Sequence, residues 1–218
     1  MTISNEARDR VKGAFEPVAL ALGRLGLTPD ALTLIGFGIT VIGATVVGLG
    51  HWTIGGLVVL LGGIFDMFDG TLARATGRVS RLGAFMDSVF DRWGEAIVYV
   101  GIITGAVLAG HERLPVLGAL AMASAFMVSY IRAKAEGLGF TEGTGMAAVG
   151  LMPREVRLVI LSLGLILASG PENLSLEVAL GIIAVGATLT SIQRILHVRQ
   201  QALSIDPAER RTNGQEHS

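Results

Sequence analysis

"FDMFDGTLARATGRVSRLGAFMDSVFDRW" (residues 65–93) gathers four aspartates in the middle of an otherwise apolar chain. Asp66 and Asp69 are spaced i, i+3, and Asp87 and Asp91 are spaced i, i+4. Residues at these spacings project from one face of a helix. Because their neighbours are apolar, a solvated loop is a poor explanation. The stretch therefore predicts two connected helices that bring the two pairs of carboxylates face to face.

The composition around this stretch indicates a membrane protein. Of the 218 residues, 51% are hydrophobic and 16% are charged, against about 25% charged in average globular domains. The 30 glycines are scattered through apolar runs, as in membrane helices that pack closely. A net charge of −1 gives no case for nucleic-acid binding. The absence of cysteine excludes disulfides, thiolate metal ligands and cysteine catalysis.

Apolar runs of sufficient length predict an all-α integral membrane protein, since a bilayer core needs about 20 mostly apolar residues per helix. Six transmembrane helices are expected, at about residues 31–50, 53–73, 82–109, 114–136, 154–168 and 176–197. Before them, apolar residues recur at helical spacing among charges, which predicts an amphipathic interfacial helix, with packing in a protein core as the alternative. We expect an interfacial unit at 1–28, a catalytic domain at 29–200 and a disordered cytoplasmic tail at 201–218.

Basic residues set the expected orientation in the membrane. They gather in the N-terminal segment, between the second and third spans, between the fourth and fifth, and in the tail. The opposite connections hold one arginine among them. By the positive-inside bias, both termini and the aspartate-rich end should face the cytoplasm, in a multi-pass protein of the plasma membrane.

The aspartates point to divalent cations. Facing carboxylates repel one another without counter-ions, and oxygen ligands without histidine or cysteine suit Mg²⁺ or Mn²⁺. Two such ions about 3.5–4 Å apart would stabilise the attacking and leaving oxygens of a phosphoryl transfer. Gly70 and Gly83 remove side chains beside the carboxylates and open space for a bulky ligand, although close helix packing explains each glycine equally well.

Read as spacing, the stretch is D-x-x-D-G-x-x-A-R-x8-G-x-x-x-D-x-x-x-D, which resembles the signature of the CDP-alcohol phosphotransferases. All eight defining positions are filled, by Asp66, Asp69, Gly70, Ala73, Arg74, Gly83, Asp87 and Asp91. Members of that family move a phosphatidyl-type group from a CDP-linked lipid to an alcohol and release CMP. The resemblance implies that the first three aspartates bind metal, and that Asp91 is the general base and also a metal ligand.

The resemblance also implies a pocket for the CDP-lipid, either CDP-diacylglycerol or CDP-archaeol, entering from the membrane lipids. Its residues would be Pro29, Asp30, Thr33, Asp69, Gly70, Ala73, Arg74 and Gly83. For the first three, helix capping is an equally good explanation, with Thr28 as N-cap and Pro29 at the helix start. Family members usually form homodimers, which the small residues of the third and fourth predicted spans permit.

Cations deep in the predicted spans point to an anionic acceptor, because buried cations need a counter-charge. "SYIRAKAEGLG", "PRE-R" and an arginine in the last span are similar to the phosphatidylinositol phosphate synthases of actinobacteria and their archaeal relatives. That similarity implies that Lys134, Arg154 and Arg194 bind the phosphate of inositol 1-phosphate. Glycerol 3-phosphate, the acceptor of phosphatidylglycerophosphate synthases, stays open as the alternative, because it too carries a phosphate.

Two other classes of protein remain as alternatives. A divalent-metal transporter also places carboxylates in membrane helices, but Arg74 beside them would repel a permeating cation, and no inverted repeat relates the two halves. A lipid-binding scaffold without catalysis would not require a base at the position of Asp91.

Overall fold

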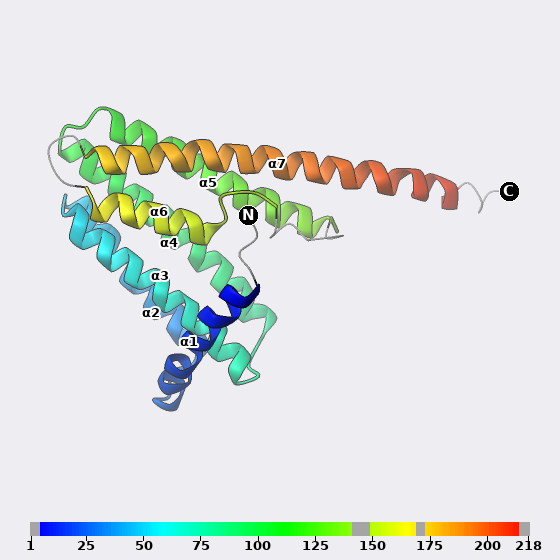
Figure 1. Cartoon of the computed structure of the whole chain (residues 1–218), viewed down its shortest axis with the longest axis horizontal. Coiled ribbons are helices and arrows are strands. Elements are labelled where there is room, and N and C mark those ends of the chain that lie inside the picture. Colours follow the sequence, from blue (N-terminus) through cyan, green and yellow to red (C-terminus); the bar gives the residue numbers. More distant parts are fainter. Residues whose placement is uncertain (1–4, 141–148, 169–172, 214–218) are drawn as a thin grey trace.

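The computed structural model describes residues 5–140, 149–168 and 173–213, which form seven helices and no strand (Figure 1). In chain order the helices are α1 (Asn5–Arg24), α2 (Pro29–Gly48), α3 (Trp52–Ala75), α4 (Arg81–Leu108), α5 (Arg113–Gly137), α6 (Arg154–Ile166) and α7 (Leu174–Asn213). Helix α7 packs along α5 and projects beyond the other helices towards the C-terminus. The all-helical fold predicted from the sequence is confirmed, and each predicted span coincides with one of the helices α2 to α7.

Four helices are long and apolar enough to cross a membrane: α2, α3, α5 and the Leu174–Leu203 part of α7. Helix α4 is long enough to cross a membrane but is not among these four, because Asp91, Arg92 and Glu95 interrupt its apolar sequence. Helix α6 has 13 residues, a length of roughly 20 Å against a hydrocarbon core of about 30 Å. The protein is thus a multi-pass membrane protein with four candidate spans, and the count of six stays a prediction.

Helix α7 also differs from the expectation at its C-terminal end. It continues to Asn213, so the boundary expected at residue 200 does not coincide with the end of a helix. Residues 214–218 of the predicted tail lie outside the described part of the chain.

Glycines set the close packing of α2 against its neighbours. A Cβ on Gly43 of α2 would lie 2.8 Å from the backbone nitrogen of Val59, and a Cβ on Gly55 of α3 would lie 2.8 Å from that of Val47. Real side chains cannot approach so closely, and glycine is the usual solution in membrane helices. On α4, a Cβ on Gly105 would lie 2.6 Å from the carbonyl oxygen of Val47. Helix α2 therefore packs tightly against both helices that carry the aspartates.

The connection between α3 and α4 brings the two aspartate pairs to the same end of the bundle. Gly77 adopts a φ of 65° in this connection, a conformation that glycine adopts at little cost. The Ser80 hydroxyl then accepts a hydrogen bond from the Gly83 N–H at 2.9 Å and caps α4. Helix α2 begins at the same end, at Pro29, and the Thr28 hydroxyl accepts a bond from the Ala31 N–H at 3.2 Å. The predicted N-cap is therefore confirmed.

Helix α1 packs against the same end of α3. Ala19 is fully buried in a small core with Leu32, Phe68 and Leu72, and the rings of Phe15 and Phe68 are 5.4 Å apart. Part of the apolar face that we expected in the membrane interface thus packs on protein. An interfacial position for α1 stays a prediction.

Candidate active site

Three of the four aspartates form a cluster. Asp66 and Asp69 of α3 and Asp87 of α4 each offer a carboxylate oxygen within 4.8 Å of the others. Asp69 is buried, and the other two are half-buried. The predicted convergence of the two pairs is therefore present for these three residues, and a set of carboxylate oxygens fits Mg²⁺ or Mn²⁺.

Asp69 is held by neighbours on both of its oxygens. The Thr33 hydroxyl, from α2, donates a hydrogen bond to Asp69 Oδ2 at 2.5 Å, and the Gly70 N–H donates to Oδ1. Thr33 Oγ1 also lies 3.2 Å from the Pro29 carbonyl oxygen. Thr33, which the family resemblance assigns to the nucleotide pocket, thus contacts a predicted metal ligand and fixes its orientation.

Asp91 lies one turn after Asp87 and outside the group of three that could share an ion. Arg154 joins it to the cluster. Its Nη1 donates a hydrogen bond to Asp66 Oδ2 at 2.7 Å and lies 2.7 Å from Asp91 Oδ1, the latter as an ion pair without hydrogen-bond alignment. Arg154, which is predicted to bind the acceptor phosphate, therefore contacts both the predicted metal ligand Asp66 and the predicted base Asp91.

The other two predicted acceptor cations make no contact with the aspartate cluster within the described residues. Arg194 is buried on α7 and donates hydrogen bonds to the carbonyl oxygens of Val128 at 2.6 Å and Val149 at 3.0 Å. Lys134 is exposed in the last turn of α5, and within the described residues its side chain makes no hydrogen bond or ion pair. The described structure does not gather the three cations into one group.

Most residues of the predicted CDP pocket gather where α2, α3 and α4 meet. A Cβ on Gly83 would lie 3.7 Å from Asp30 Oδ1, and a Cβ on Gly70 would lie 3.2 Å from Arg74 Nη1. Asp30 and Arg74 are exposed, while Ala73 is half-buried. The side of Arg74 facing α1 borders a pocket of about 260 Å³, which Glu16 also lines. Space and a guanidinium group for a phosphate-bearing ligand are thus available at Arg74.

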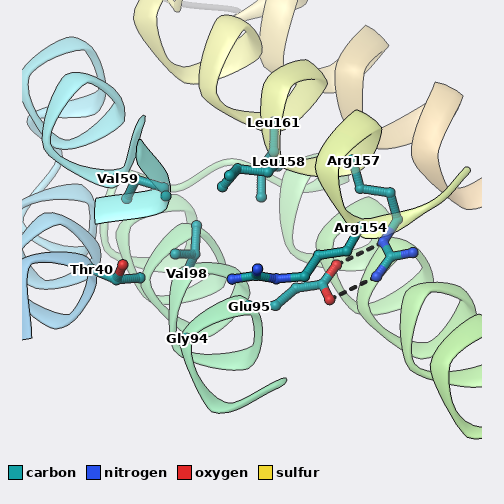
Figure 2. A pocket seen from close by; sticks show the side chains of 10 residues that line it. Thr40, Val59, Gly94, Glu95, Val98, Arg154, Arg157, Leu158 and Leu161 are labelled. Carbon is teal, nitrogen blue, oxygen red and sulfur yellow. Dashed lines mark hydrogen bonds and ion pairs between the residues drawn. The ribbon is translucent and has the colours of Figure 1, made fainter. Parts of the chain in front are cut away.

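A second group of charges, which the sequence analysis missed, lies next to Arg154 (Figure 2). The side chain of Arg157 is 1% exposed, and its Nε and Nη2 donate to the two oxygens of Glu95 at 2.7 and 2.8 Å. Arg92 Nη1 lies 3.5 Å from Glu95 Oε2, and its Nη2 lies 3.4 Å from Asp91 Oδ2. The available signal was spacing, because Glu95 follows Asp91 by four residues and Arg157 follows Arg154 by three.

A small cavity separates this group from α2 and α3. Its volume is about 30 Å³, and Thr40, Val59, Glu95 and Arg154 are among the residues that line it (Figure 2). That volume suffices for a water molecule, and the polar side chains supply partners for one.

An acidic cluster at one end of a bundle of membrane helices, in contact with a guanidinium group, is typical of membrane-embedded enzymes that act on phosphate esters. The sequence profile of the CDP-alcohol phosphatidyltransferases matches residues 26–192. The chain belongs to this family, and the resemblance predicted from the aspartate motif is confirmed.

Relatives with named activities cover nearly the whole chain. An archaetidylinositol phosphate synthase of Pyrococcus horikoshii is 30% identical over 197 residues, which are 90% of this chain and 97% of the relative. A phosphatidylinositol phosphate synthase of Mycobacteroides abscessus is 34% identical over 203 residues, which are 92% of this chain and 90% of the relative.

Solved structures of one enzyme share the fold. The crystal structure of the phosphatidylinositol phosphate synthase of Mycobacterium tuberculosis with CDP-DAG bound superposes with a TM-score of 0.74 at 32% identity, covering 84% of this chain and 92% of that one. The same enzyme in complex with manganese and citrate also superposes with a TM-score of 0.74, at 30% identity, covering 84% and 88% of the two chains.

Proposed function

We propose that this protein transfers the phosphatidyl or archaetidyl group of a CDP-linked lipid to inositol 1-phosphate, releasing CMP and forming phosphatidylinositol phosphate. The observation that carries the proposal is the Asp66–Asp69–Asp87 cluster with Arg154 held between it and Asp91. The names of the relatives support inositol phosphate as acceptor. The similar crystal structure of the Mycobacterium tuberculosis synthase with CDP-DAG bound supports a CDP-linked lipid as donor.

The carboxylate cluster would hold Mg²⁺ or Mn²⁺. The crystal structure of the Mycobacterium tuberculosis synthase in complex with manganese and citrate supports this assignment. Two ions are expected, with Asp91 completing the ligand set. Bound divalent cations supply positive charge beside the diphosphate and its leaving oxygen. Thr33 and the Gly70 N–H orient Asp69 for this task.

Asp91 acts as the general base in this mechanism. It accepts the proton of the acceptor hydroxyl, whose oxygen then attacks the β-phosphorus of the CDP-lipid. The bond between that phosphorus and the oxygen of CMP breaks, and its electron pair leaves with CMP. Arg154, which already lies beside Asp91, would hold the acceptor phosphate together with Lys134 and Arg194, and so keep the hydroxyl near the base.

The CDP moiety would occupy the space where α2, α3 and α4 meet. Glycines there leave room beside the carboxylates, and Arg74 offers a guanidinium to phosphate. The residues assigned to this pocket are Pro29, Asp30, Thr33, Asp69, Gly70, Ala73, Arg74 and Gly83.

The membrane arrangement belongs to the same proposal. It includes six spans, with α4 and α6 crossing beside the four apolar helices. The positive-inside bias then favours a cluster at the cytoplasmic side of the plasma membrane, with both termini cytoplasmic. Helix α1 lies at the interface, residues 29–200 form the catalytic domain, residues 201–218 form a cytoplasmic tail, and two chains form a homodimer. The helices packed against α4 and α6 would shield the charged residues of these two helices from lipid, as charges inside a membrane require.

A direct comparison of acceptors tests the proposed function. Protein in membranes receives Mg²⁺ and CDP-diacylglycerol or CDP-archaeol, and CMP release is measured with inositol 1-phosphate, glycerol 3-phosphate, free inositol and serine. The fastest release is expected with inositol 1-phosphate. Preference for glycerol 3-phosphate would establish the alternative synthase, and the absence of release with every acceptor would refute the activity.

A further inference from the structure

Glu95 of α4 has both carboxylate oxygens engaged by a buried guanidinium (Figure 2). Arg157 donates to them through Nε and Nη2 at 2.7 and 2.8 Å. Such two-point contacts fix the direction of both side chains as well as their separation. Because Arg157 is 1% exposed, loss of the Glu95 charge would leave a buried guanidinium without its counter-ion. The pair therefore fixes α6 against α4 at one defined place.

That place determines where Arg154 lies. Arg154 is the first residue of the 13-residue helix α6, and Arg157 follows it by three residues on the same face. Arg157 also donates from Nη1 to the Met152 carbonyl oxygen at 2.8 Å, immediately before the helix begins. The ion pair between Arg157 and Glu95 thus fixes the first turn of α6. Arg154 extends from that turn to reach Asp66 and Asp91.

Glu95 reaches the predicted base by a second route. Arg92 lies between the two acidic residues, with Nη1 3.5 Å from Glu95 Oε2 and Nη2 3.4 Å from Asp91 Oδ2. Arg92 also donates a hydrogen bond to the Ser129 hydroxyl of α5. Without the charge of Glu95, Arg157 would lose its counter-ion, and Arg92 would lose one of the two carboxylates that fix its position.

We propose that Glu95 is a positioning residue for the acceptor side of the reaction. It holds Arg154 in place through Arg157 and holds Arg92 against Asp91, and it acts through these guanidiniums rather than on substrate. The inference rests on the proposed function, because it takes Arg154 as a ligand of the acceptor phosphate. A purely structural role for the same ion pair would lower stability without distinguishing one substrate from the other.

Two substitutions separate these roles. Glu95→Gln keeps the shape of the side chain and removes its charge. Arg157→Lys keeps the charge but loses the two-point contact, so it carries the test if the Gln variant does not fold. Leu114→Ala is the matched control, because Leu114 is fully buried in the main hydrophobic core and lies at the start of α5, outside the site.

Steady-state CMP release gives the KM of each substrate, titration calorimetry gives inositol 1-phosphate binding, and thermal unfolding gives stability. Residues that orient ligands typically change activity or affinity by about 10- to 100-fold. Both site variants should therefore raise the KM and weaken the binding of inositol 1-phosphate about tenfold or more, with the KM of the CDP-lipid changed by less than about twofold. The Leu114→Ala variant should lower the unfolding temperature and leave both KM values unchanged.

Equal changes in both KM values, or lower stability alone, would overturn the positioning role while the proposed function stands. If the wild-type protein releases no CMP with any phosphorylated acceptor, the proposed function itself fails and the inference with it.

Discussion

Replacing Thr33 with Val tests whether the helix N-terminus of α2 orients the metal site. The hydroxyl donates to Asp69 Oδ2 at 2.5 Å, and both residues are buried, at 6% and 5% exposure. Valine keeps the shape of threonine but cannot donate. Asp69 then retains the Gly70 N–H on its other oxygen, and water has little access to replace the lost partner.

The expected loss of Mn²⁺ affinity follows from the burial of Thr33 and from the charge of the Asp69 carboxylate that accepts its hydrogen bond. A hydrogen bond to a charged group contributes about 1.5–3 kcal/mol, and each 1.4 kcal/mol is about tenfold in an equilibrium constant. Since the bond is present before any ion binds, part of this energy is common to the metal-free and metal-bound states. We therefore expect a loss near the lower limit, about tenfold in Mn²⁺ affinity, because an unrestrained carboxylate must be ordered when the ion binds.

Mn²⁺ binding can be followed by electron paramagnetic resonance of the free ion, with purified protein in detergent and without nucleotide. Thr45→Val is the matched control, because the Thr45 hydroxyl is on the same helix but donates to the Val41 carbonyl oxygen of its own helix at 2.9 Å. A folded Thr33→Val protein with the Mn²⁺ affinity of the wild type would refute the argument that α2 orients Asp69.

Three further substitutions test the site and the packing. Asp91→Asn should lower kcat for CMP release by about 10²–10⁴-fold while the unfolding temperature stays near that of the wild type; near-normal turnover would remove Asp91 as base. Arg194→Gln should raise the KM of inositol 1-phosphate well above any change for the CDP-lipid, and equal changes would place Arg194 outside the acceptor pocket. Gly43→Ala should destabilise the protein by about 1–3 kcal/mol, because the new Cβ would lie 2.8 Å from the backbone nitrogen of Val59; an unchanged unfolding temperature would contradict the close packing of α2 on α3.

The sequence predicted the helices and the carboxylate cluster because both follow from short-range patterns. Apolar runs gave helices whose ends agree with the structure to within a few residues, apart from the C-terminal end of α7. The i, i+3 and i, i+4 spacings put each aspartate pair on one face, and a short connection brought Asp66, Asp69 and Asp87 together. Hydropathy could not settle the number of spans, because α4 carries charges and α6 is short.

The position of Arg154 could not be predicted in the same way. It contacts Asp66 across 88 residues of sequence, and Arg157 contacts Glu95 across 62. Such pairs depend on how α6 packs against α3 and α4, which no periodicity in one helix encodes. Arg154 has carboxylate partners, as predicted for a deep cation, whereas Arg194 donates to backbone carbonyl oxygens; the sequence did not distinguish the two cases.

The order of charges across the site explains why residues outside the family signature matter for residues within it. Carboxylates and guanidiniums alternate through successive contacts, in the order Asp66, Arg154, Asp91, Arg92, Glu95 and Arg157. In surroundings of low dielectric each charge depends on its neighbours in this series, so removing one member takes a counter-ion from each residue beside it. The signature supplies the groups that the chemistry needs. Glu95 and Arg157, which the signature does not contain, link two helices beside Arg154 and Arg92. If Asp91 is the base and Arg154 binds the acceptor, as proposed, packing between α4 and α6 sets the acceptor side of the site.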